Sequence, residues 1–267
     1  MPLRLMPRSP LDRFIEFFWA ADTYHARTPR ERVLASSGQV LVIPLDGQPV
    51  EFGADAHAPV LSRFFDGVLF GARRGPTVIG TAFGRTVGIH FKPGGARPFF
   101  ELPAHEFQDR VVPLEAMWGR SGELLREQLA QARGPSERIG LLESFLLARA
   151  RCLERPQALG AALCAFEEPG LPSVAEVNRR TGLSPKRLIA LFRDEIGLSP
   201  KAFWRVERFR AALRDLEAGH HRGAALAGEH GYFDQAHFLR EFRALAGSGL
   251  REYLVHRVPG SDHVSIA

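Results

Sequence analysis

The chain has 267 residues, of which 45% are hydrophobic and 24% charged, and its formal net charge at pH 7 is +5. This length suits two ordinary domains with their own hydrophobic cores. No stretch approaches the roughly 18 consecutive apolar residues of a membrane helix, and the prolines and acidic residues near the N-terminus do not fit a signal peptide. We therefore expect a cytoplasmic protein with no membrane partner.

The N-terminal part is predicted to be rich in β-structure. Residues 10–19 have apolar side chains at helical spacing and predict one short helix. From about 30 to 92, β-branched runs are broken by Gly and Pro, as in short strands of an antiparallel sheet or small barrel. Asp46-Gly47 has the composition of a hairpin turn. We expect residues 1–120 to form a β-rich, cupin-like domain that senses a ligand or mediates association.

Helical patterns follow over residues 121–168, with Ser136 as a candidate N-cap. This segment could dimerise or pack on both neighbouring domains, and we favour a homodimer. Its two cysteines, Cys152 and Cys164, predict reduced, partly buried thiols. Pro169-Gly170 is the expected domain boundary.

An internal repeat dominates the C-terminal part. "GLSPKRLIALFRDEIGLSPKAFW" (182–204) aligns with "GYFDQAHFLREFRALAGSGLREYL" (231–254), so that glycines and large apolar residues recur in register. Each copy has a short amphipathic helix, a glycine turn, and a second helix that begins at Ser184 or Asp234, two preferred capping residues. Helix, glycine turn and helix form the helix-turn-helix unit, whose second helix enters the DNA major groove.

A long helix is predicted to join the two units. Ser199 caps it, Pro200 takes its first position, and Arg205, Arg208 and Arg214 are expected to point towards phosphates or solvent. A rigid connection could place the two recognition helices in successive major grooves, ~34 Å apart. Residues 171–255 also carry most of the basic surplus, with a net charge of +4 against +1 for residues 1–170.

The C-terminal stretch resembles the AraC/XylS family of bacterial transcription regulators. The family's G-F-x-D-Q-x-H-F-x-R-x-F core is matched at Gly231, Tyr232, Asp234, Gln235, His237, Phe238, Arg240 and Phe242. The N-terminal part is similar to sensor-type domains of one branch of that family. The sequence departs from the family at Asn178, where Ala is usual, at Gly249-Leu250, which replaces a Ser/Thr-Pro pair, and at Leu254, where Arg is usual.

The repeat assigns DNA-contacting residues in both units. Gln pairs with adenine, Arg with guanine, and an aliphatic group touches the thymine methyl. The candidates are Pro185, Lys186, Arg187, Ile189, Ala190 and Arg193 in the first unit, Arg205 in the joining helix, and Gln235, His237, Leu239, Arg240 and Arg243 in the second unit.

The predicted fold class is thus α+β, with a β-rich domain (1–120), a helical linker or dimerisation segment (121–168), an all-α double helix-turn-helix domain (171–255) and a flexible tail (256–267). The predicted function is a sequence-specific transcription regulator, an activator or a repressor, whose partner is double-stranded DNA. A small-molecule effector and RNA polymerase are candidate partners.

No paired catalytic signature, metal-ligand spacing or cofactor motif is present, so we expect no catalytic residues, no metal and no cofactor. His57, His90 and His105 are too scattered to predict a metal site. An enzyme or metal-binding activity in the N-terminal barrel remains the alternative, and a nonspecific architectural DNA-binding protein is a second one.

Overall fold

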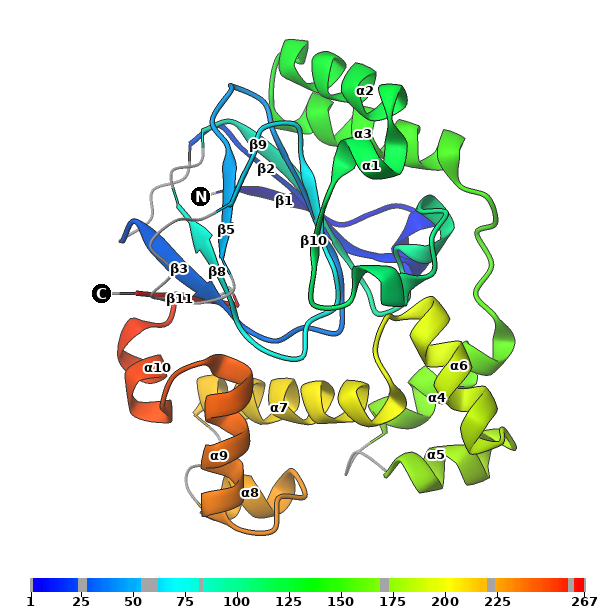
Figure 1. Cartoon of the computed structure of the whole chain (residues 1–267), viewed down its shortest axis with the longest axis vertical. Coiled ribbons are helices and arrows are strands. Elements are labelled where there is room, and N and C mark those ends of the chain that lie inside the picture. The colour runs from blue at the N-terminus through cyan, green and yellow to red at the C-terminus, as the bar shows by residue number, and fades with distance from the viewer. Residues whose placement is uncertain are drawn as a thin grey trace.

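The computed structural model describes residues 2–23, 28–53, 62–81, 84–168, 173–219, 224–258 and 262–266. A β domain of two antiparallel sheets lies above a group of helices (Figure 1). The six-stranded sheet runs in the order β1 (Leu3–Leu5), β2 (Ile15–Ala21), β9 (Thr86–Phe91), β4 (Val40–Pro44), β7 (Val68–Phe70) and β10 (Val111–Pro113). The five-stranded sheet runs in the order β11 (His263–Ser265), β3 (Arg30–Val33), β8 (Thr77–Gly80), β5 (Val50–Gly53) and β6 (Ser62–Phe64).

The two sheets pack together and do not close into a barrel, so of the two expected arrangements, an antiparallel sheet or a small barrel, the barrel is wrong. Val42, Val68 and Phe70 of the six-stranded sheet form one buried cluster with Val50 and Ile79 of the five-stranded sheet. Burying apolar side chains from two facing sheets is the usual source of stability in such a sandwich.

The helix predicted over residues 10–19 is wrong. The chain has only a 3₁₀ turn there, η1 (Leu11–Arg13), followed by strand β2. The pairing of β2 with β9 shifts register between Ile15 and Phe17, so β2 contains a bulge. Ile15 and Phe18 are both fully buried, and the extra residue between them imitates the i, i+3 spacing of a helix.

The turn at Asp46-Gly47 is correct, but its interpretation as a hairpin is wrong. Gly47 has φ of 79°, in the left-handed region that favours glycine. However, β4 pairs with β7 and β9, whereas β5 pairs with β6 and β8. The turn therefore carries the chain from one sheet to the other.

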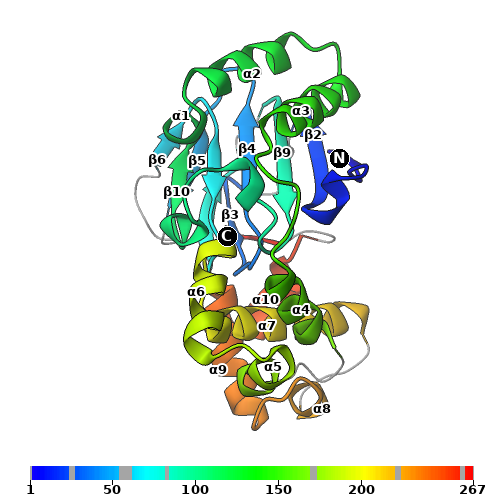
Figure 2. The ribbon, with the colours of Figure 1, turned by 90° about the vertical axis from the view of Figure 1, so that its right-hand side faces the viewer.

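Three helices follow β10 in the chain: α1 (Leu114–Trp118), α2 (Arg120–Gln131) and α3 (Pro135–Arg149). α3 contacts β1, β2 and β9, and α2 lies at the end of the sheets opposite the C-terminal helices (Figure 2). Ser136 does not cap α3, because the N-cap is Gly134 and Pro135 takes the first helical position. Two further 3₁₀ turns, η2 (Arg97–Phe99) and η3 (Ala104–Phe107), follow β9.

Seven helices form the C-terminal part among the described residues: α4 (Gln157–Glu167), α5 (Val174–Thr181), α6 (Pro185–Glu195), α7 (Pro200–Ala218), α8 (Ala224–Glu229), α9 (Gln235–Ala246) and α10 (Leu250–His256). They share one hydrophobic core, which also takes in Leu34, Ala35 and Ala72 of the β domain. The two parts are therefore packed against each other along an apolar seam. The expected boundary at Pro169-Gly170 lies outside the described residues, and no described helix is long and apolar enough to cross a bilayer.

The flexible tail predicted for residues 256–267 is wrong where the structure describes it. Strand β11 pairs antiparallel with β3, and Val264 is fully buried. The backbone N–H of Leu34 donates to the carbonyl of Asp262, whose carboxylate lies 2.8 Å from Arg210 of α7. The chain thus returns from the helical part to complete the β domain. Cys152 and Cys164 are free, but both are exposed and not partly buried.

Candidate nucleic-acid interface

The first helix-turn-helix unit consists of α5 and α6. Gly182 ends α5 with φ of 66°, and the Ser184 hydroxyl accepts a hydrogen bond from the backbone N–H of Arg187 at the start of α6. Leu188 and Phe192 of α6 are fully buried. The glycine makes the turn and the serine satisfies a free helix donor, so the sequence itself fixes where the second helix begins.

The second unit, α8 and α9, repeats this construction. Gly231 has φ of 66°, and the Asp234 carboxylate accepts from the backbone N–H of His237 at 2.6 Å. Phe238 and Phe242 are buried with their rings 5.8 Å apart. The predicted repeat and both predicted caps are confirmed in the structure.

The candidate residues of the first unit lie on the outer face of α6. Pro185, Lys186 and Arg187 occupy its first turn and are exposed, and so are Ile189 and Ala190. Arg193, two turns further on, is exposed as well. In contrast, Arg179 and Arg180 of α5 bind the Glu176 carboxylate, and these hydrogen bonds lower the pKa of Glu176 to about 2.

The candidate residues of the second unit divide into two groups. Gln235, Leu239, Arg240 and Arg243 are exposed on one side of α9. His237 is only half exposed, and its Nδ1 accepts a hydrogen bond from the backbone N–H at position 233. That imidazole therefore holds the turn as well as facing outward.

Arg205 and Arg208 of α7 have other partners. Arg205 makes a two-point ion pair with Glu241 of α9, at 3.1 and 2.6 Å. Partial burial alone would raise the pKa of Glu241, but the hydrogen bonds and charge of Arg205 hold it below its ordinary value. Arg205 thus connects the joining helix α7 to α9 of the second unit through an ion pair.

The expectation that Arg208 points outward is wrong. Its side chain is 4% exposed, and its guanidinium lies 4.2 Å from the ring centre of Trp204 and 4.0 Å from that of Tyr232. It also donates to the carbonyl of Gly231 in the turn of the second unit. Arg208 therefore fastens the joining helix to this turn through cation–π contacts and a hydrogen bond.

Phe233 was not among the predicted site residues. It lies in the turn directly before α9, and 92% of it is exposed. The sequence held a signal, because Tyr232 already fills the core position that Leu183 takes in the first unit. Phe233 is the additional turn residue of the second copy, and a core role does not explain it.

The two recognition helices, α6 and α9, both contact the joining helix α7. In Figure 1, α6 and α9 stand near opposite ends of α7 and run in the same sense, with their N-terminal ends away from the sheets. Their C-terminal ends are docked on the β domain: His105 lies 3.4 Å from Asp194, and the N–H of Ala35 donates to the carbonyl of Leu245. The 19 residues of α7 span about 28 Å, close to the ~34 Å of one DNA turn.

Comparisons with known proteins agree with this arrangement. Residues 177–255 match the family described as "Helix-turn-helix domain", and residues 3–113 match "Domain of unknown function (DUF6597)". The C-terminal part is an AraC-type helix-turn-helix domain. With this domain, the chain is a DNA-binding transcription regulator.

Solved structures of ToxT from Vibrio cholerae are similar to this chain at low sequence identity. An apo lysine-to-alanine variant of ToxT has 10% sequence identity and a TM-score of 0.49, over 89% of this chain and 97% of that one. A ToxT structure with a bound unsaturated fatty acid has 8% identity and a TM-score of 0.47, over 94% and 96%. No curated protein sequence matches the chain.

Proposed function

We propose that this transcription regulator recognises a specific two-part DNA site, with α6 and α9 in successive major grooves on one face of the duplex. The arrangement of two exposed recognition helices at the ends of one rigid helix carries this proposal. An architectural protein that binds DNA without sequence preference needs positive charge but no such paired geometry.

Within this proposal, the exposed side chains divide between base edges and backbone. Gln235 and Arg240 reach bases in the second unit, and Lys186 and Arg187 do so in the first. Arg193 and Arg243, further along the helices, neutralise phosphates. The exposed Phe233 ring contacts a thymine methyl group, as apolar side chains do in the major groove.

The β domain controls how the recognition helices are presented, because it holds the C-terminal ends of both. A change in its packing on α7 would shift the population of DNA-competent arrangements. The protein would act in the cytoplasm without catalysing a reaction, and RNA polymerase and a second copy of the chain are its proposed protein partners.

Selection of bound sequences from a random DNA pool with the full-length chain tests the proposal. The expected result is a motif with two conserved blocks whose centres lie about 10–10.5 base pairs apart. Enrichment of one block alone would show that the two helices do not bind together. Equal affinity for random and selected DNA at fixed salt would identify an architectural protein.

A further inference from the structure

The two glycines that follow the recognition helices differ from the other turn glycines of the helical part. Among the described residues after 173, a positive φ is found at Gly182, Gly197, Gly219, Gly231 and Gly247, a conformation that glycine adopts most easily and that often ends a helix. At three of these, a Cβ atom would have no neighbour within 4 Å among the described residues. The two exceptions are Gly197 after α6 and Gly247 after α9, which hold equivalent positions in the repeat.

Gly197 lies directly against the β domain at η3. A Cβ atom here would lie 2.7 Å from the carbonyl oxygen of Ala104, the first residue of η3, which is well inside the ~3.5 Å of an ordinary contact. Only a glycine lets the two backbones come this close. η3 lies between β9 and β10, and its Phe107 is buried in one cluster with Leu41 and Ile89 of the six-stranded sheet. The first unit is therefore held by this sheet.

Gly247 lies against the other sheet in the same way. A Cβ atom at Gly247 would lie 2.7 Å from Cδ of Arg32 in β3 and 2.7 Å from Cγ of Pro76, which directly precedes β8. The side chain of Arg32 is 11% exposed and also lies 3.6 Å from the carboxylate of Glu252 in α10. Both strands belong to the five-stranded sheet. Each sheet of the sandwich thus holds one helix-turn-helix unit.

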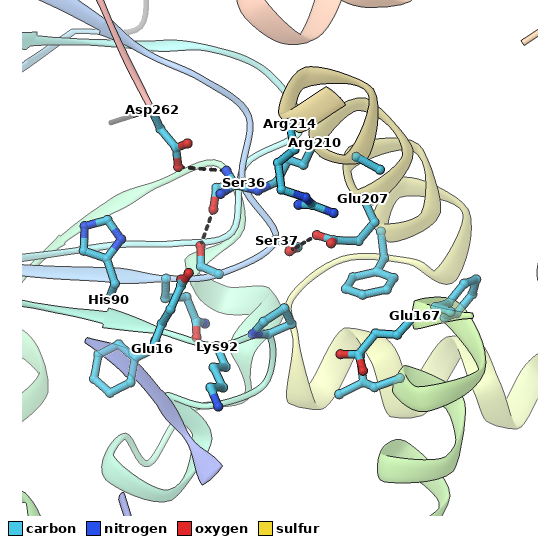
Figure 3. A pocket seen from close by; sticks show the side chains of 18 of the residues that line it. Glu16, Ser36, Ser37, His90, Lys92, Glu167, Glu207, Arg210, Arg214 and Asp262 are labelled. Carbon is cyan, nitrogen blue, oxygen red and sulfur yellow. Dashed lines mark hydrogen bonds and ion pairs between the residues drawn. The ribbon is translucent and has the colours of Figure 1, made fainter. Parts of the chain in front are cut away.

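The joining helix meets the β domain less directly. A cavity of about 680 Å³, here called the seam cavity, lies beside the middle of α7. Figure 3 shows that its walls come from residues 36–39, β9, α4, α7 and the segment at Asp262 just before β11. Polar contacts cross it, because the Ser37 hydroxyl donates to Glu207 and Arg210 lies 2.8 Å from Asp262. Along this stripe of α7 the two parts are therefore separated, whereas at the two glycines they touch.

We propose that the contacts at Gly197 and Gly247 determine the spacing between the two DNA blocks, so that both glycines are positioning residues for DNA recognition. The proposal rests on the proposed function, in which α6 and α9 bind successive major grooves. In the chain, α7 joins the two units. The sandwich adds a second connection between them, because one buried cluster links its two sheets. If either glycine contact is lost, α7 alone holds the units, and a wider range of spacings becomes accessible.

Sites of different spacing measure this restraint. Two extra base pairs between the blocks move the second block by about 7 Å along the duplex and turn it by about 70° around the axis. A rigidly held pair of helices cannot bind both blocks of such a lengthened site. We expect the parent chain to bind it at least about tenfold less tightly than the best site, because simultaneous binding is lost.

Gly197→Ala and Gly247→Ala each place a methyl group against the β domain and should separate the contact. In each variant, the ratio of the affinities for the best and the lengthened site should fall to about threefold or less. Affinity for the best site should also fall, since the two helices are no longer held ready to bind together. Fluorescence anisotropy with labelled duplexes at fixed salt measures both quantities.

Gly219→Ala is the matched control for the glycine variants. Its φ of 76° imposes the same backbone strain on alanine, but the added methyl group has no neighbour within 4 Å among the described residues. It should keep the affinity ratio of the parent chain.

A charge reversal at an exposed position guards against misfolding of the glycine variants. Glu252→Arg replaces the ion pair with Arg32 by repulsion between two guanidinium groups, so it should lower the affinity ratio in the same direction. Glu127→Arg makes the same change of charge on the exposed face of α2, at the far end of the sheets (Figure 2). This control should keep the parent ratio.

Two results would overturn the proposal. An unchanged ratio in the glycine variants and in Glu252→Arg would mean that α7 alone sets the spacing. Tighter binding of the best site by these variants would mean that the contacts hold the helices away from DNA. In both cases the proposed function survives, whereas a parent chain without preference for a two-block site would remove the proposed function itself.

Discussion

Replacing Asn178 by alanine should stabilise the protein. The side-chain oxygen of Asn178 is buried in α5 and has no hydrogen-bond partner among the described residues. Relieving a buried unpaired polar group is worth about 1–3 kcal/mol, and alanine is favoured over asparagine within a helix by about 0.6 kcal/mol. Lost contacts of the half-buried side chain offset part of this gain. We expect a net increase of about 1–2 kcal/mol in the free energy of unfolding.

Urea denaturation followed by circular dichroism measures this change, and the melting temperature should rise by about 2–8 °C. Gln128→Ala, on the exposed part of α2, is the control for helix propensity alone and should give less than half the gain. A stability equal to or below that of the parent chain would refute the reasoning, because it would mean that Asn178 has a partner in solution.

Four other substitutions test the interface and the seam. Arg240→Ala should cost about 1–3 kcal/mol of DNA-binding free energy and relax the preference at one base position, and unchanged selection profiles would contradict this. Arg193→Ala should weaken binding to all sequences equally and reduce the salt slope by about 1, as measured by titration at several salt concentrations. Arg208→Met should destabilise the fold by about 2–4 kcal/mol, since it loses two cation–π contacts and a charged hydrogen bond; a urea midpoint within error of the parent would disprove this role. Asp262→Asn tests the ion pair with Arg210, which holds the pKa of Asp262 below its ordinary value although burial opposes this. The carboxylate therefore contributes its full stabilisation above its unfolded pKa of about 3.9, and this contribution is lost as the pH falls through the lower folded pKa. The free energies of unfolding of the parent chain and of Asp262→Asn should differ at pH 7 and converge in acid.

The DNA-binding part could be predicted because its signals are local. Ser184 and Asp234 cap the recognition helices, and Gly182 and Gly231 make the turns, each within a few residues of the element that it defines. The recurrence of one pattern at a fixed spacing then made two units the simplest interpretation.

The elements that were missed depend on distant partners. A bulge in β2 gave strand residues the spacing of a helix. β11 is three residues long and becomes a strand only by pairing with β3. Arg208 is buried because the second unit packs over a helix face that the sequence alone would leave to solvent.

The seam cavity had no signature along the chain for the same reason. Its lining residues come from segments spread along the chain from Glu16 to Asp262, and each is an ordinary polar or apolar residue in its own context. Only the packing of the helical part on the β domain brings Gln39, Glu207 and Asp262 together.

The position of β11 bears on how the protein is synthesised and handled. Because this strand follows both helix-turn-helix units in the chain, the β3 edge of the sheet stays open while the DNA-binding part leaves the ribosome. An open edge is a site for pairing with other chains, so the nascent regulator is exposed to aggregation until β11 docks. A purification tag placed directly after residue 266 would crowd this docking site, whereas one before β1 would leave it untouched.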